Sequence, residues 1–364
     1  MKRTIVILAL VATLASACGA GANPTASHSP AGATPSAATA SGALSCRLPV
    51  AGFVISAPKG QPDNSIGSDG QDNQKGTGGF LDVASGKFTP DSKSDRSYLA
   101  AAGKWLPVSM QAVSPDQREY VQGKARQSSA GAAPTTTLYM VQVATGASRQ
   151  LYAPADGQMA VVIAFTSKGI FAVTASSTGP GATELLLIDP ANGASHPVAG
   201  SQTPPGVTYS VFTAVAGDYA WGTRITGTQQ QPSFQLVRLS LIDATVVVWR
   251  HSETMPLFVL GFDADGYPLV SGDGVPTGGL TSLSLLPAAG RSTRIPVNGG
   301  VFLQGRGTPL RDGYGTWFGS GDGSIWLYSS STGLHKVATV PPQAGGSGQP
   351  YDQHAWRSVA GPCS

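Results

Sequence analysis

An acidic segment near the start of the chain has the residue types that bind cations. Asp63, Asp69 and Asp72 lie close together, and Asn64 and Asn73 stand beside them. Carboxylate and amide oxygens are the ligands that Ca²⁺ prefers, but the spacing of these residues fits no EF-hand loop. We therefore predict a candidate binding loop at Asp63, Asp69 and Asp72, with no bound metal and no cofactor, and keep a Ca²⁺ site as the alternative.

Cys18 follows a segment with the features of a secretion signal. After two basic residues, residues 5–14 are apolar but shorter than the about 20 residues of a membrane-spanning helix, and residues 15–17 are small. This pattern resembles the lipobox of bacterial lipoproteins, although Ala15 stands where the strict form has leucine. The resemblance implies that residues 1–17 are a lipoprotein signal peptide and that Cys18 carries lipid. Cleavage by ordinary signal peptidase, without lipidation, is the alternative.

Two further cysteines stand at the two ends of the part that can fold. Residues 18–45 are almost wholly Ala, Ser, Thr, Gly and Pro, which suits a flexible tether, and residues 46–364 form the predicted domain. Cys46 opens this domain and Cys363 closes it. Because disulfides persist in exported proteins, we predict a Cys46–Cys363 disulfide, with two free thiols as the alternative.

The search for catalytic motifs finds none. The sequence has no G-x-S-x-G, P-loop, H-E-x-x-H or C-x-x-C pattern, so we assign no catalytic residue. The histidines are isolated from one another along the chain: His28, His196, His251, His335 and His354. The net charge of +3 is spread out without a Lys/Arg cluster, which gives no support for nucleic-acid binding.

A recurring β-hairpin indicates the elements that would position any site. Equivalent apolar residues recur with a period of about 43 to 50 residues, the range of four-stranded propeller blades. These residues are Tyr139, Leu186, Leu236, Leu283 and Trp326. The chain is also rich in glycine (47 residues) and has no convincing helical period after the signal, so we predict an all-β fold.

The repeats predict a single β-propeller of about six four-stranded blades. Blade one is split, with strands in residues 51–56, 79–84 and 86–89 and an inner strand from 355–360, so that the ring closes between the N- and C-terminal segments. Seven blades would require another hairpin within Pro90 to Lys104, which is too polar and too short. The other blades are expected at Leu106–Tyr152, Met159–Val198, Tyr209–Trp249, Leu257–Val297 and Val301–Val340.

Two segments carry a family resemblance. Residues 112–122 (AVSPDQREYVQ) resemble the Ser-Pro-Asp-Gly turn of TolB-like, WD40-like propeller repeats, with Gln117 in place of glycine, and residues 138–150 (LYMVQVATGASRQ) resemble the hairpin that follows it. The resemblance implies a fold and nothing catalytic, because these motifs shape turns. Asp116 is expected to cap its own turn, and Gly146 and Gly333 to supply positive φ. The pair Asp263 and Asp265 is likewise interpreted as a hairpin turn.

The length variation between strands is concentrated on one face of the predicted ring. Insertions in repeat proteins often lie on the binding face, although merely tolerated insertions are the alternative. We therefore predict a surface-anchored lipoprotein, held at the membrane by its lipid only, that binds a protein or glycan of the cell envelope or serves as a scaffold. An exported polysaccharide hydrolase or lyase and a purely structural envelope protein are the alternatives. The long segments are Pro58 to Thr77, Lys124 to Thr136, Ser176 to Thr183, Thr226 to Ser233, Gly272 to Gly279 and the connector Gly200 to Val207.

Overall fold

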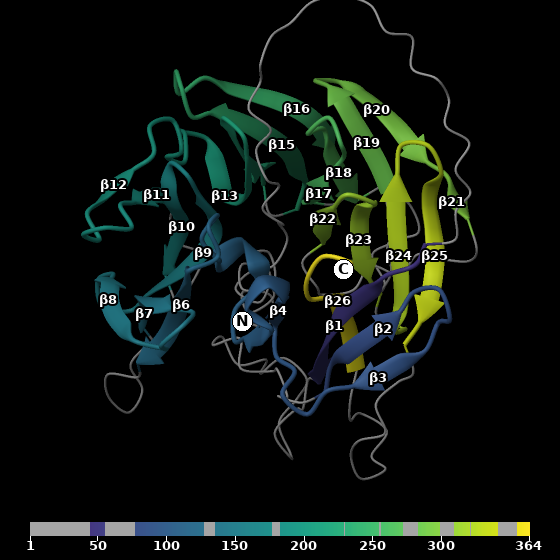
Figure 1. The fold of residues 1–364 in the computed structure, drawn as a ribbon. Helices are drawn as coiled ribbons and strands as arrows, with labels where there is room; N and C mark the ends of the chain where they lie inside the picture. Colours follow the sequence, from purple (N-terminus) through teal and green to yellow (C-terminus); the bar gives the residue numbers. More distant parts are fainter. Residues whose placement is uncertain are drawn as a thin grey trace, which may run out of the picture.

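The protein is a six-bladed β-propeller in a computed structural model (Figure 1). The structure describes residues 44–54, 77–126, 135–176, 183–228, 230–254, 256–271, 283–298, 309–320, 322–340 and 355–364. Strands make up almost all of the regular structure in these ranges, beside two short 3-10 helices. The prediction of an all-β fold with six blades and almost no helix is therefore confirmed.

Blades three, four and five are four-stranded antiparallel sheets built from continuous stretches of chain, close to the predicted bounds. Each strand alternates its side chains between the two neighbouring blades. Blade three comprises β9 (Gln158–Thr166), β10 (Gly169–Ser176), β11 (Glu184–Ile188) and β12 (Ser195–Pro197). Blade four comprises β13 (Val207–Ala216), β14 (Tyr219–Gly227), β15 (Pro232–Ser240) and β16 (Val246–Ser252). Blade five comprises β17 (Val259–Phe262), β18 (Pro268–Ser271), β19 (Leu283–Ala288) and β20 (Arg291–Ile295).

Blade six has four antiparallel strands and a short fifth strand that runs parallel to its outer edge. Its predicted start at Val301 lies outside the described residues. The strands are β22 (Leu310–Asp312), β23 (Gly315–Gly319), β24 (Ser324–Ser329) and β25 (Gly333–Thr339), with β21 (Val297–Asn298) beside β25.

Blade one combines the two ends of the domain, as predicted. Its inner strand β26 (Ala355–Val359) pairs with β1 (Arg47–Val54), followed by β2 (Gly79–Asp82) and β3 (Phe88–Pro90). The strand β1 begins at Arg47, earlier than the predicted residue 51. Figure 1 shows β26 beside β1 on the inner side of the ring.

Blade two differs from the prediction. Its sheet has three strands, β6 (Glu119–Arg126), β7 (Thr135–Gln142) and β8 (Ser148–Tyr152). The segment from Leu106 to Val113 was expected to form the inner strand, but it contributes a single bridge, from Val113 to Tyr120, and the 3-10 helix η2 (Met110–Ala112). Leu106, at the start of this segment, pairs instead with Ser97 in a separate hairpin, so the segment joins blade two only near Val113.

A hairpin that the sequence argument excluded lies between blades one and two. Strand β4 (Ser97–Leu99) pairs with β5 (Lys104–Leu106), and the 3-10 helix η1 (Ala100–Ala102) connects them. The hairpin contacts both neighbours: the amide of Tyr98 donates to the carbonyl of Ala360 (2.7 Å), and Lys104 Nζ donates to the carbonyl of Val143 (3.0 Å). It fills the junction and adds no seventh blade.

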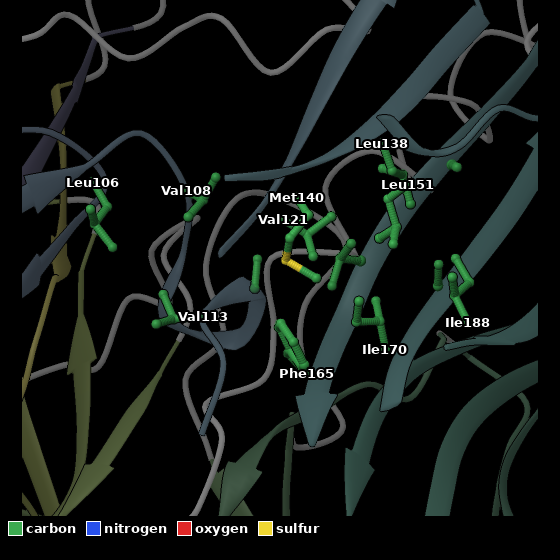
Figure 2. Packing of buried hydrophobic residues seen from close by; sticks show 14 of the residues in the cluster. Leu106, Val108, Val113, Val121, Leu138, Met140, Leu151, Phe165, Ile170 and Ile188 are labelled. Atoms are coloured by element: carbon green, nitrogen blue, oxygen red, sulfur yellow. The ribbon is translucent and has the colours of Figure 1, made fainter. Parts of the chain in front are cut away.

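The core consists of apolar clusters between neighbouring blades. Figure 2 shows the cluster that joins blades two and three, in which Leu138, Met140 and Ile170 are at most 2% exposed.

The turn residues adopt the backbone conformations that the repeats predict. Gly146 and Gly333 have φ of 74° and 70°, and Gln117 adopts φ of 62° where the related repeats have glycine. Asp116 Oδ1 accepts the amide of Arg118 (3.1 Å), which is the predicted cap.

The two faces of the ring differ in the length of the connections between strands. We call one the short-turn face, where the first strand of each blade turns into the second and the third into the fourth, as at residues 217–218 and 241–245. The other is the long-connection face, where the second and third strands are joined. Its connections are residues 55–78, 127–134, 177–183, 228–231, 272–282 and 320–323, and the connector 198–206 between blades three and four lies at the same face.

Candidate binding face and ring closure

The contacts that join the two ends of the domain to each other in blade one, and to blade six, are called the seam here, and they include the predicted disulfide. Cys46 and Cys363 are bonded, with their Cα atoms 5.5 Å apart and a separation of 317 positions in the sequence. The backbone of Arg47 exchanges two hydrogen bonds with that of Ser364, of 2.8 and 3.2 Å. The two ends of the domain are therefore joined by a covalent bond and by backbone pairing.

Asp312 ties the C-terminal segment to blade six. Its Oδ2 accepts hydrogen bonds from the amide of Cys363 (3.0 Å) and from Nε1 of Trp317 (2.8 Å), a tryptophan that is completely buried. Its Oδ1 accepts the amide of Tyr314 (2.8 Å). One carboxylate thus holds a hairpin turn, a core tryptophan and the backbone beside the disulfide.

The strand β26 is held on its other side as well. The guanidinium of Arg357 is buried, donates to the carbonyl of Thr77 and lies over the ring of Phe88 at 5.4 Å from the centroid. Burial lowers the pKa of Arg357 below its usual range. Gly319 of β23 lies so close to the Arg357 carbonyl that a Cβ at this position would collide with it. Blade six and β26 therefore pack backbone against backbone.

An aromatic cluster supports the junction between blade one and the β4–β5 hairpin. Tyr98 and Trp105 are paired across the hairpin, and both rings contact Phe80 of β2 at centroid distances of 4.9 and 5.5 Å. The guanidinium of Arg47 stacks on Phe80 at 3.7 Å, and Nε1 of Trp105 donates to Asp91 (2.9 Å). The amide of Lys93, and to a smaller extent this indole bond, hold the pKa of Asp91 below its usual range.

The other predicted site residues fall into two groups. Cys18, Asp63, Asp69 and Asp72 lie outside the described residues, so lipidation and the candidate binding loop stay predictions. Asp263 is described, and it serves the turn that was expected: its Oδ1 accepts the amides of Asp265 (3.0 Å) and Tyr267 (2.8 Å). Burial raises the pKa of this carboxyl.

Within the described ranges, no group of three or more His, Cys, Asp or Glu side chains could hold a metal ion. In the same ranges no helix is long and apolar enough to cross a membrane. The described histidines His196 and His251 are exposed on separate blades, and His335 is partly buried beside the hydroxyl of Thr332. His28 and His354 lie outside the described residues.

The sequence argument missed several buried or partly buried polar residues. Asp312 and Arg357 close the ring, and Arg224 of β14 is only 8% exposed between blades three and four. A signal existed for Arg224, since it occupies an interior position of a strand whose neighbouring residues are apolar or small. No sequence signal indicated which blade Asp312 or Arg357 would touch, because these contacts depend on how the ring closes.

Comparison with solved structures finds distant similarities to other proteins. The fold resembles TolB from Acinetobacter baumannii with a TM-score of 0.46 and 12% identity, over 88% of this chain and 68% of that chain. It also resembles an oligogalacturonate lyase from Vibrio parahaemolyticus with a TM-score of 0.42 and 12% identity, over 64% of this chain and 65% of the lyase. At such identities and scores the likeness concerns the fold and says nothing about activity. No protein-family model and no curated protein matches the chain.

Proposed function

We propose that the protein is an exported, lipid-anchored binding or scaffold module that captures a protein or glycan of the cell envelope at its long-connection face. The observation that carries this proposal is the difference between the two faces of the ring. The connections 55–78 and 272–282 join strand ends at one face and have 24 and 11 residues, while the turns between strands at the other face have two to six. Loops held on a rigid scaffold are the common place for binding residues.

The ring closure supports the rigid-scaffold part of the proposal. The disulfide, the Asp312 contacts and the β26 pairing fix the two ends of the domain to each other. A disulfide between chain segments so far apart is also typical of proteins outside the reducing cytosol, which supports export. The propeller would thus present its connections from a frame that does not open.

Two modification sites at opposite ends of one strand test the face. Gln230 precedes β15 at the long-connection face, and Ile242 follows it at the short-turn face; both are exposed. Each is replaced by cysteine and coupled to a polyethylene glycol chain, and capture of solubilised envelope material is measured. We expect about tenfold weaker capture for the Gln230 conjugate and unchanged capture for the Ile242 conjugate. The reverse pattern would move the binding surface to the short-turn face.

The anchor has a separate test. Cys18→Ser removes the thiol that lipidation requires, so the variant is expected in the culture medium while the unmodified protein stays with the membrane. Fractionation followed by immunoblotting measures the distribution. Retention of the serine variant at the membrane would contradict the lipid anchor and leave the binding face untouched.

A further inference from the structure

Arg224 occupies an unusual position for an arginine, because it lies between two blades. It belongs to β14 and is paired in register with Ser210 of β13 on one side and Gln235 of β15 on the other. Residues paired in this way project to the same side of a sheet. On that side of blade four, two and four residues away, Gly222 and Ala220 face blade three, and Ala220 packs in one cluster with Phe171. Arg224 therefore enters the interface between blades three and four.

One nitrogen of the Arg224 guanidinium is buried without a partner in the part of the chain that the structure describes. This nitrogen is Nε, and the hydroxyl of the neighbouring Ser210 is buried without a hydrogen bond too. Neither described ion pair involves Arg224. Burial is the one cause that lowers the pKa of Arg224. A guanidinium has five donors, and a buried charge left without acceptors strongly disfavours the folded state. The arrangement therefore lacks an acceptor with a negative charge.

The unpartnered groups lie near the long-connection face. Arg224 is in the last part of β14, which ends at Gly227, and Ser210 is in the first part of β13. Thr183, at the start of β11 in blade three, donates its hydroxyl hydrogen to the Ser210 carbonyl. These ends of the strands all meet the connections of that face. A ligand bound there would approach Arg224 along the edge of the interface.

We propose that Arg224 and Ser210 form a binding site for one carboxylate group of an acidic peptide partner. A planar guanidinium fork matches a carboxylate with two parallel hydrogen bonds, and the serine hydroxyl can donate a third. One cation beside neutral groups balances one negative charge, which fits a carboxylate better than a phosphate with its nearly double charge. The side chain is 8% exposed, so the acceptor must reach in on a narrow stem, as an aspartate or glutamate side chain or a chain end does.

Acetate is the probe that tests the site on the intact exported protein. As acetate replaces chloride at constant ionic strength, we expect the ¹⁵N–¹H signal of the Arg224 Nε group to shift until it saturates. The melting temperature should rise over the same range of acetate concentrations, because a ligand of the folded state stabilises it. Arg224→Gln should abolish both effects. Arg238→Gln is the matched control: Arg238 lies on β15 of the same blade, stacked on Tyr219 at 4.1 Å and Trp249 at 4.8 Å, and its loss should leave the acetate response intact.

Further arms identify the source of the carboxylate and keep the test decisive. We expect N-acetyl-glutamate amide to bind more tightly than glucuronate. The opposite order of affinities would mean that the partner is a sugar acid and not a peptide. Tighter binding of phosphate than of acetate would contradict a carboxylate ligand. If Arg224→Gln does not fold, Ser210→Ala should weaken acetate binding several-fold. A response that does not saturate, or that persists unchanged in these variants, would refute the site.

The site deepens the proposed function by giving the partner a chemistry, and the part that concerns the partner rests on the proposed face. The two failures can be told apart. If acetate binds at Arg224 but the Gln230 conjugate has no effect on capture, the carboxylate site stands and the proposed binding face is refuted. If the Gln230 conjugate captures less material but acetate does not bind, the binding face stands and the carboxylate site is refuted.

Discussion

The seam and the interface between blades three and four solve the same packing problem with different interactions. At the seam, a disulfide, the carboxylate of Asp312 and the pairing of β26 with β1 join segments that are far apart in the sequence. Blades three and four follow each other along the chain and meet through an apolar cluster that includes Phe171. Two blades that follow each other along the chain share an apolar cluster, whereas the two distant segments that share blade one are also joined by a covalent bond and backbone pairing.

The largest expected effect comes from removing the covalent link at the seam. The double substitution Cys46→Ser and Cys363→Ser should lower the free energy of unfolding by about 5 kcal/mol, because the disulfide restricts a very long loop of the unfolded chain. Denaturant unfolding measures this difference, and reduced unmodified protein should match the variant. Hydrogen exchange should rise first in β1 and β26, with β10 and β14 little changed. If hydrogen exchange rose equally in all blades, the contacts at the seam would not depend on the disulfide more than the rest of the ring does.

The next effect concerns the continuous interface. Phe171 is 1% exposed in the cluster between blades three and four, and Phe171→Ala should lower the free energy of unfolding by about 4 kcal/mol through lost burial and the cavity left behind. Phe171→Leu keeps most of the volume and should cost about 1 kcal/mol. Equal losses for the two variants, measured by thermal unfolding, would contradict an interface held by packed volume.

Asp312 gives a smaller effect at the seam. Asp312→Ala removes the acceptor of the Trp317 and Cys363 donors and should cost about 2 kcal/mol, since a buried indole N–H is left without a partner. Asp312→Asn retains an acceptor oxygen and should cost less. Chemical unfolding of both variants under oxidising conditions checks this order. A loss for the asparagine variant as large as that for alanine would mean that the negative charge, and not the hydrogen bonds, holds the turn.

The smallest effect is expected at Asp263, which lies away from the seam. Asp263 belongs to the turn after the first strand of blade five, as Asp312 does in blade six. Burial raises the pKa of this carboxyl, so its charged form destabilises the folded state. At neutral pH, Asp263→Asn should therefore raise the free energy of unfolding by about 0.5 to 1 kcal/mol while it keeps the acceptor for two backbone amides.

The pH dependence of the Asp263 effect follows from the direction of the pKa shift. The folded protein takes up the proton as the pH falls through the raised pKa, and the gain from asparagine shrinks until it vanishes below the ordinary carboxyl pKa near 3.8. Unfolding curves of both proteins from acid to neutral pH measure the difference. A gain that grew toward acid would contradict the sign.

The blade repeat was predictable because local residues determine it. Hairpin glycines such as Gly146 and Gly333 need positive φ, and alternating apolar residues identify strands that face two neighbours. The failures were local too. The expected inner strand of blade two loses Leu106 to the β4–β5 hairpin, and the cross-strand pair of Tyr98 and Trp105 stabilises that hairpin, which looked too polar to form.

The candidate sites were predictable only where the sequence alone could pair residues. If Cys18 is set aside for lipid, as predicted, Cys46 and Cys363 are the two cysteines that remain, so their pairing followed from elimination. The surroundings of Asp312 and Arg224 depend on the register of strands and on the contact between separate blades. Such long-range placement leaves no pattern in the neighbouring residues.

The split blade has a consequence for the order in which the protein can fold. Strand β1 is synthesised near the beginning of the domain, but its inner partner β26 is made after blades two to six. During that time the inner edge of β1 has exposed amide and carbonyl groups, which can pair with other chains. Contacts between such distant segments also form slowly. Formation of the Cys46–Cys363 disulfide therefore reports that the two ends of the ring have met, and its rate of formation would measure this late step of folding.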